Sequence, residues 1–417
     1  MKQLIFAGLA GLFSIFIMSC QSMQGSGPAV FSTQETWQNN MSMQPEAWKQ
    51  GADRWFVASG SPNTAEIINR QAPSTQAIST IMVRPSHFTK IKVNGSFQVQ
   101  IFSGVTHNSV FIYGPNEAAR AVMVVMKGNK LEICQAENAP SDMNRVIVRI
   151  GVAKLSSLVH MGDGTVEAIY IQPDPLNLKL SGNGSLYLSG QVNLRKVNNC
   201  GNGAINVFGV LSPRVKIISS GSGNINLCGK IGVSSITHTG NGNINILGAN
   251  SDRLTIDSVG GGKIRIKGIV NLCRLNAENG SCVFVQGVLS PRLDVNQSGQ
   301  SIVGLSGAVK NLHVNTIQTA IFYGQDICAE NVYATACDDS HINISASHKA
   351  FASVEGNGSI YFYGQPAVLT TFIKDKGVIV PIPRPYRMCY YTPRVSYKDE
   401  VVLKRTPKAR VAAPYIK

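Results

Sequence analysis

The sequence predicts an all-β protein, a single-stranded β-helix or solenoid of about ten turns of 19–20 residues, with an N-terminal β cap. Three observations predict this fold. A glycine-containing corner recurs at a nearly constant interval, aliphatic residues keep a fixed place relative to each corner, and the chain has 40 glycines but only 15% charged residues. Low charge with many glycines favours β-structure with tight turns over helical bundles.

The corners recur in stretches such as "GNGNINILG", which begins at Gly240. A strand that recurs at this interval cannot close its own core, whereas stacked turns bury a continuous one. Glycine suits such a corner because it tolerates positive φ and because its lack of a side chain lets turns stack at about 4.8 Å. The first corner position falls at Gly162, Gly182, Gly201, Gly221, Gly240, Gly260, Asn279, Gly299, Gln318, Asp338 and Gly356.

Aliphatic residues stand four and six places after each corner, with a polar or variable residue between them. This alternation is typical of a strand with one buried face. In a stacked solenoid each aliphatic position becomes a column, so we expect Ile225, Ile244 and Ile264 to be neighbours in the core.

Two other glycine-rich motifs fit the sequence poorly. A dinucleotide-binding or phosphate-binding loop needs a following helix or a GK[ST] sequence, and neither follows these corners. A calcium-binding nonapeptide repeat needs a repeated Asp after the glycines, where "GGGKIRIKG" offers Lys263. The sequence therefore predicts no cofactor and no metal site.

The N-terminus reads as a lipoprotein signal peptide over residues 1–20. "MKQLIFAGLAGLFSIFIMSC" has a basic Lys2, a short apolar run and then Cys20 after a small residue, which resembles a bacterial lipobox. We expect Cys20 to be acylated and to anchor the protein in a membrane, with an ordinary cleaved signal peptide as the alternative. Gln21 after the cysteine resembles the pattern that sorts lipoproteins to the outer membrane, facing the periplasm or the cell surface.

Three further regions follow. Residues 21–82 read as a tether and a Trp-containing linker, 83–365 as the solenoid domain, and 366–417 as a capping strand with a basic C-terminal tail. Within the solenoid domain, residues 83–150 are expected to form its first turns or its cap, because an open end exposes backbone edges.

The formal net charge of +15 is unevenly placed. Residues 371–417 hold eleven Lys and Arg but only three Asp and Glu, so they carry about half of it. Such a tail favours anionic partners, which here include lipid headgroups and anionic envelope polymers as well as acidic faces of envelope proteins. The alternative is a tail that only improves solubility, and specific nucleic-acid binding is not expected.

Eight cysteines remain besides Cys20, and none forms a CxxC pair. In the repeat register no two of them stack in the same column of neighbouring turns, so most are expected to be free thiols. A Cys328–Cys337 disulfide outside the repeat register stays open as an alternative.

The candidate interaction surface is the outward column between the two aliphatic ones. Asn206, Asn226 and Asn245 occupy it in consecutive turns, and Tyr187 and Tyr361 occupy it elsewhere. Stacked amides and aromatic rings could bind a glycan, whereas the structural alternative is that the amides hydrogen-bond each other along the coil. The scattered carboxylates, histidines and serines form no catalytic set, so no catalytic residue is predicted.

The opening "FTKIKVNGSFQVQIFSG", then "KGNKLEI", then turns of the form GNGxIxΦxG resemble the bacterial head GIN domain family of proposed auto-transporter adhesins. The resemblance covers about 83–365. It implies a right-handed β-helix-like fold, export, and no established enzyme activity, and it brings no catalytic residues to transfer. The chain departs from the family in its larger number of turns and its basic tail.

These observations together predict a non-enzymatic, lipid-anchored protein of the cell envelope, whose rigid solenoid mediates adhesion or binds proteins or glycans. One alternative is a structural subunit of a larger outer-membrane assembly. The other is a polysaccharide-active enzyme, since solenoids also host such enzymes.

Overall fold

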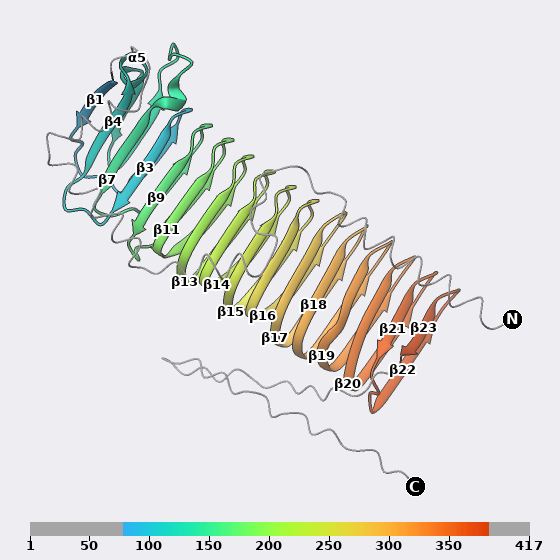
Figure 1. Cartoon of the computed structure of the whole chain (residues 1–417). Coiled ribbons are helices and arrows are strands. Elements are labelled where there is room, and N and C mark those ends of the chain that lie inside the picture. The colour runs from blue at the N-terminus through green and yellow to red at the C-terminus, as the bar shows by residue number, and fades with distance from the viewer. Residues whose placement is uncertain (1–77, 383–417) are drawn as a thin grey trace, which may run out of the picture. The chain divides into compact units, whose positions relative to one another are not determined.

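A computed structural model describes residues 78–382 of the chain. These residues form a β-solenoid of about 12 turns, as Figure 1 shows. The all-β solenoid prediction is confirmed, with slightly more turns than the ten expected.

The elements occur in the following order: β1 (Ile78–Val83), β2 (Lys90–Asn94), β3 (Gln98–Ser103), β4 (Ser109–Pro115), α5 (Asn116–Arg120), β5 (Val122–Lys127), β6 (Lys130–Gln135), η2 (Met143–Arg145), β7 (Ile147–Val152), β8 (Ser157–His160), β9 (Val166–Ile171), β10 (Leu176–Leu180), β11 (Leu186–Val192), β12 (Leu194–Asn199), β13 (Ile205–Ser219), β14 (Ile225–His238), β15 (Ile244–Ser258), β16 (Lys263–Ala277), β17 (Cys282–Gln297), β18 (Ile302–Thr316), β19 (Ile321–Ala336), β20 (His341–Val354), β21 (Ser359–Tyr363), β22 (Val368–Ile373) and β23 (Val378–Ile382).

Two walls of parallel strands enclose the core. The first wall contains the strands that follow each corner, such as β9 and β11, and the second wall contains β8, β10 and β12. From β13 to β20 a single strand of 14 to 16 residues runs through the first wall, bends, and continues in the second. The repeat of 19–20 residues is therefore one circuit around the core.

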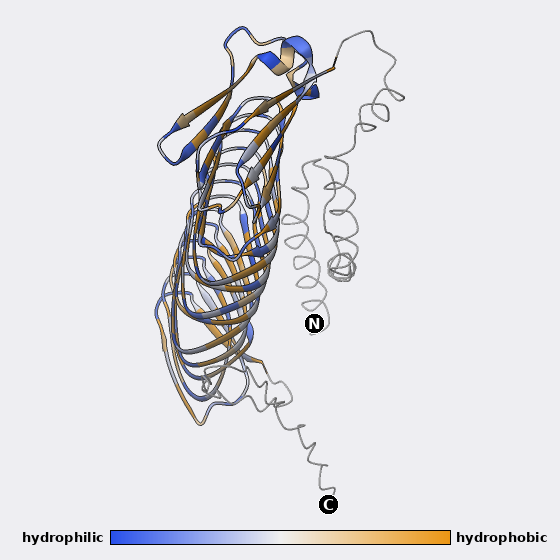
Figure 2. Cartoon of the chain, turned by 90° about the vertical axis from the view of Figure 1, so that its left-hand side faces the viewer, coloured by the Kyte–Doolittle hydropathy of each residue, from blue (hydrophilic) through white to orange (hydrophobic). Residues whose placement is uncertain are grey.

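The aliphatic columns lie inside, as the alternation predicts. Ile225 pairs with Ile244, and Ile244 pairs with Ile264, across adjacent parallel strands. All three side chains are fully buried. The strands accordingly carry hydrophobic and hydrophilic bands side by side along the solenoid (Figure 2). Because each such residue packs between the equivalent residues of the two neighbouring turns, every turn completes the core of the next.

The N-terminal end is covered by antiparallel strands. The turn formed by β2 and β3 lies against β8 and β9, and the later strands β6 and β7 stack on its other side. Beyond them, β5 pairs antiparallel with β6, and β4 pairs antiparallel with both β7 and β1. The short helix α5 connects β4 to β5. The strands β4 to β7, which follow β2 and β3 in sequence, therefore lie outside them and cover this end of the solenoid. This arrangement confirms the expected β cap.

The other end continues further than the columns indicated. β22 pairs in parallel with β20, and β23 pairs in parallel with β21, so residues after Pro366 form one more turn. Inward positions of this turn are half exposed: Leu369 is 45% and Ile373 50% exposed, whereas their partners Ala350 and Val354 are fully buried. Within residues 78–382 this end of the core is uncovered.

Two kinds of corner occur along the solenoid. In turns up to Gly262 the glycines are needed because the backbones touch; a Cβ on Gly242 would lie 2.1 Å from the carbonyl oxygen of Gly223, and φ there is not positive. From Asn279 onward the first corner residue adopts left-handed φ, with values of 57° at Asn279 and 58° at Asp338. Close backbone contact and positive φ, which the sequence predicts together for each corner, are therefore found in different turns.

The cysteines largely follow the prediction. Cys134, Cys200, Cys228, Cys273, Cys282 and Cys337 are free thiols. Cys328 is disulfide-bonded, but since Cys337 is free the Cys328–Cys337 pairing is wrong. Those two residues lie on either side of the second-wall strand of β19, whose extended backbone holds them apart.

Several predictions concern residues outside 78–382. These are the signal peptide, Cys20, nearly all of the 21–82 linker with its tryptophans, and the basic tail from residue 383. Among the helices of the described part of the chain, none has the length and apolar character to cross a membrane.

Candidate interaction surface

The predicted amides form a hydrogen-bonded ladder on the outside of the first wall. Asn226 Nδ2 donates to Asn206 Oδ1, and Asn245 Nδ2 donates to Asn226 Oδ1, each at 2.8 Å. Asn206 is 8% exposed, and the other two are half-buried. Much of their hydrogen-bonding capacity is used within the ladder, so the arrangement fits the structural alternative better than a glycan-binding strip.

The two predicted tyrosines occupy the same column. Tyr187 lies directly beside Asn206 and is 44% exposed, so it extends the ladder by one accessible ring. Tyr361 lies beside Asn343. Tyr361 is six turns beyond Asn245, so the two residues are about 29 Å apart at the usual strand spacing. The structure therefore brings four of the five predicted residues together and leaves Tyr361 apart from them.

A second ladder, on the outside of the second wall, was not predicted. Asn276 Nδ2 donates to Asp257 Oδ1 at 2.7 Å, and Asn296 and Asn315 continue the chain of bonds at 3.1 and 3.2 Å. These residues stand three places before each corner. Their constant place before the corner is a signal in the sequence that could have revealed them.

Aromatic rings stack beside this second ladder. The ring centroids of His313 and Tyr333 are 4.6 Å apart, and those of Tyr333 and Phe351 are 5.1 Å apart, with interplanar angles of 17° and 5°. Tyr333 and Phe351 are 40% and 38% exposed. Because the ring faces cover one another, the stack presents ring edges to solvent and stabilises the coil.

Buried polar side chains line the inside of the corners. His160 donates from Nε2 to the carbonyl oxygen of Gly164 at 2.7 Å, and Asn199 donates to the carbonyl of Gly203 at 3.0 Å. His238 occupies the same column and is fully buried. Burial lowers the pKa of both His160 and His238, because it penalises the charged imidazolium. His160 forms a hydrogen bond within its corner, and His238 fills the interior of another corner. Both side chains are fully buried, so a large ligand cannot reach them.

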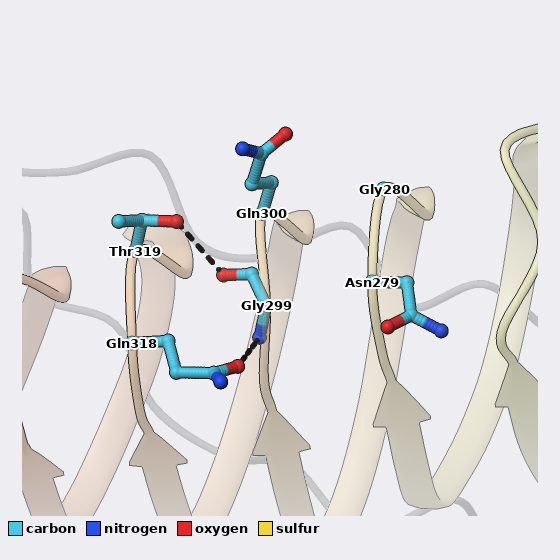
Figure 3. A pocket seen from close by; sticks show the side chains of 6 residues that line it. All are labelled: Asn279, Gly280, Gly299, Gln300, Gln318 and Thr319. Atoms are coloured by element: carbon cyan, nitrogen blue, oxygen red, sulfur yellow. Dashed lines mark hydrogen bonds between the residues drawn. The ribbon is translucent and has the colours of Figure 1, made fainter.

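A shallow depression lies on the outside of the later corners (Figure 3). Gln318 Oε1 accepts from the backbone N–H of Gly299 at 2.6 Å, and Thr319 Oγ1 donates to its carbonyl at 3.1 Å. None of the lining side chains is titratable or charged, so the depression offers no acid, base or nucleophile. The residues lining it are Asn279, Gly280, Gly299, Gln300, Gln318 and Thr319.

One serine–histidine contact resembles part of a catalytic set. His341 Nδ1 lies 2.5 Å from Ser359 Oγ, across the consecutive strands β20 and β21, which are adjacent in the first wall. Ser359 is only 3% exposed, so a substrate cannot approach its hydroxyl. Among the described residues no group of three His, Cys, Asp or Glu could hold a metal ion.

The family comparison agrees with the sequence motifs. The family model described as "Putative auto-transporter adhesin, head GIN domain" matches residues 87–269 and 271–366, which is more than half of the chain. The chain belongs to the head GIN domain family. The matched range ends before β22 and β23, so the last turn lies beyond the part shared with the family model.

The solved structures that match this GIN-domain chain share little sequence with it. A putative adhesin from Bacteroides fragilis is 17% identical and covers 74% of this chain and 99% of its own, with a TM-score of 0.23. A putative adhesin from Parabacteroides distasonis is 13% identical over 74% and 98%, with a TM-score of 0.27. A putative lipid binding protein from the same species is also 13% identical over 74% and 98%, with a TM-score of 0.24. The comparison with curated proteins gave no match.

Proposed function

We propose that this GIN-domain protein is exported, anchored to the outer membrane through a lipid on Cys20, and binds envelope or host partners through the outside of its solenoid without catalysing a reaction. The observation that carries the proposal is the stack of parallel strands, which holds outward side chains in aligned columns and leaves some of them accessible, such as Tyr187 beside Asn206. A rigid surface lowers the entropy lost on binding. The adhesin description of the family supports the same role.

A binding assay with the full-length chain tests this function. We expect the protein to retain specific ligands from an immobilised glycan panel or an envelope extract, and to leave soluble polysaccharides intact. Release of new reducing ends or unsaturated sugars from any polysaccharide would instead identify the chain as an enzyme.

The anchor requires its own test. Replacing Cys20 with Ser removes the thiol that the lipid would modify, so we expect the protein to move from the membrane fraction to the soluble fraction. Unchanged fractionation of the Cys20→Ser protein would overturn the anchor and leave the binding role open.

A structural subunit of a larger outer-membrane assembly is the second candidate. The exposed last turn favours it, because Leu369, Phe372 and Ile373 are 45%, 62% and 50% exposed next to strand edges that have no pairing partner within residues 78–382. Native purification from membranes decides between the two roles. Stoichiometric envelope subunits that dissociate on Phe372→Glu would support the assembly, whereas a chain that purifies alone supports the adhesion-like role.

A further inference from the structure

We propose that the second wall carries a binding site for an acidic polysaccharide near the start of the solenoid. The site is a cationic strip formed by Lys179, Arg195, Lys196, Arg214 and Lys216 on β10, β12 and β13. This inference rests on the proposed binding role, but it names a surface and a ligand chemistry that lie apart from the amide ladder and from the basic tail.

The sequence around the strip lacks negative charge. Between Asp174 and Asp252 the chain has no Asp or Glu at all, whereas it has six Lys and Arg. The solenoid from residue 278 to 382 shows the opposite balance, with five Lys and Arg against eight Asp and Glu. The positive charge is therefore a local property of these turns and does not follow from the basic composition of the whole chain.

The fold concentrates this charge on one face. Lys196 lies directly opposite Lys216 on adjacent parallel strands, an arrangement that costs stability because like charges face each other. Arg214 precedes Lys216 by two residues and so points to the same side. All five side chains of the strip are exposed, and none of them takes part in the eight ion pairs found among residues 78–382.

Two asparagines alternate with the cations. Asn177 lies beside Lys196, and Lys179 lies beside Asn198, so amide and ammonium groups form a checkerboard. Unlike the ladder amides, the side chains of Asn177 and Asn198 make no hydrogen bond to the described residues. Their donors and acceptors are available for a ligand, and amides recognise hydroxyl groups. Cations beside free amides fit a polymer that carries both anionic groups and hydroxyls.

Other anionic macromolecules fit this face less well. Single-stranded nucleic acids bind aromatic side chains that stack on the bases, and no aromatic residue occurs in β10, in β12 or in residues 209–219 of β13. A membrane surface requires several protruding apolar residues. On β13, Ile218 is half-buried, and Leu211, which is 50% exposed, lies beside Lys230. Cations on rungs about 4.8 Å apart suit a linear polymer that lies along the solenoid.

The test uses the full-length chain with polygalacturonate, dextran sulfate and neutral dextran as probes. We expect both acidic polymers to bind and neutral dextran not to bind, with affinity that falls as salt is raised. The double substitution Lys196→Gln and Lys216→Gln should weaken binding about tenfold, because it removes two charge contacts. The matched control is Lys310→Gln with Lys349→Gln, which removes two exposed, unpaired lysines from later turns and should leave binding unchanged.

A second pair of variants tests the hydroxyl recognition. Asn177→Ala with Asn198→Ala should weaken binding of polygalacturonate but not of polyphosphate, which has no hydroxyl groups along its chain. Equal effects on both polymers, or equal binding of single-stranded DNA and of anionic vesicles, would show nonspecific charge attraction and overturn the proposal. Failure of every acidic polymer to bind, while neutral glycans or envelope proteins still bind, would overturn this site and leave the proposed adhesion-like function standing.

Discussion

The two halves of the solenoid stack the same kind of turn with different corners. Up to Gly262 the corner glycines are packed against the preceding turn, so that a Cβ would meet a carbonyl oxygen at about 2 Å, as for Gly242. From Asn279 onward the corner residue is left-handed and the next position is open, with nothing within 4 Å of a Cβ on Gly280. One repeat length therefore accommodates two solutions to the same bend: close-packed corners that require glycine, and left-handed corners that also accept Asn, Gln or Asp.

The largest expected effect comes from adding one methyl group to a close-packed corner. Gly242→Ala places its Cβ 2.1 Å from the carbonyl oxygen of Gly223, and backbone atoms cannot move away without separating the turns. We expect the free energy of unfolding to fall by about 3 kcal/mol or more, measured by denaturant titration. Gly280→Ala is the matched control and should be nearly neutral. Equal stability of the two variants would mean that the halves do not differ in this way.

The left-handed corners should respond to a change in backbone preference. Asn279 is exposed and has φ of 57°, so Asn279→Ala should cost about 1 kcal/mol by forcing an ordinary residue into this conformation. Asn279→Gly should cost less, because glycine adopts the conformation freely. The thermal unfolding midpoints of the two variants give the comparison, and a more stable alanine variant would contradict it.

A smaller effect concerns the pH dependence of stability, and it is not confined to one half, because burial also lowers the pKa of His341 in β20. Burial lowers the pKa of His160 and His238 in the first half, so the unfolded chain takes up protons first as the pH falls. Their contribution to stability is therefore complete above the unfolded pKa, about 6.5, and decreases as the pH falls below it. We expect the unfolding midpoint of His238→Asn to decrease less than that of the wild type between about pH 8 and pH 5. A steeper decrease in the variant would be the contrary result.

The smallest effect concerns the amide ladder. Asn226→Ala removes one acceptor and one donor from a partly exposed chain of hydrogen bonds, so we expect a loss of about 0.5 kcal/mol in stability. If the ladder is structural, ligand binding by the full-length chain should stay unchanged when it is measured below the unfolding range. Loss of binding without loss of stability would instead indicate that the ladder is a binding strip.

Much of the fold could be predicted because the buried columns obey simple periodicity. Ile225, Ile244 and Ile264 repeat at the same place after each corner, and hydrophobic burial alone aligns them. The last turn was missed although its corner was visible, since Asp375 follows Gly356 by 19 residues and has the left-handed φ of 66° seen at Asp338. The aliphatic column six places after the corner is interrupted there by Pro381.

The outer surface was harder to predict than the core. The Asn206–Asn226–Asn245 ladder was visible because identical residues repeat in three turns, whereas the second-wall ladder begins with Asp257 and lies before the corner. The His313–Tyr333–Phe351 stack uses three different residue types, so periodicity alone does not reveal it. Lys196 and Lys216 become a charged pair only when the register of the second wall is known.

The uncovered last turn also bears on how the length of such a domain is set. A closed barrel fixes its strand number by geometry, but an open coil, whose last described circuit comprises β22 and β23, can gain or lose whole circuits without changing the others. The motif Ser-Pro-Arg occurs at Ser212 and again at Ser290, 78 residues later, which matches duplication of a multi-turn unit. Each duplicated circuit would lengthen the solenoid by about 4.8 Å, so the length of the domain is open to adjustment by gene duplication.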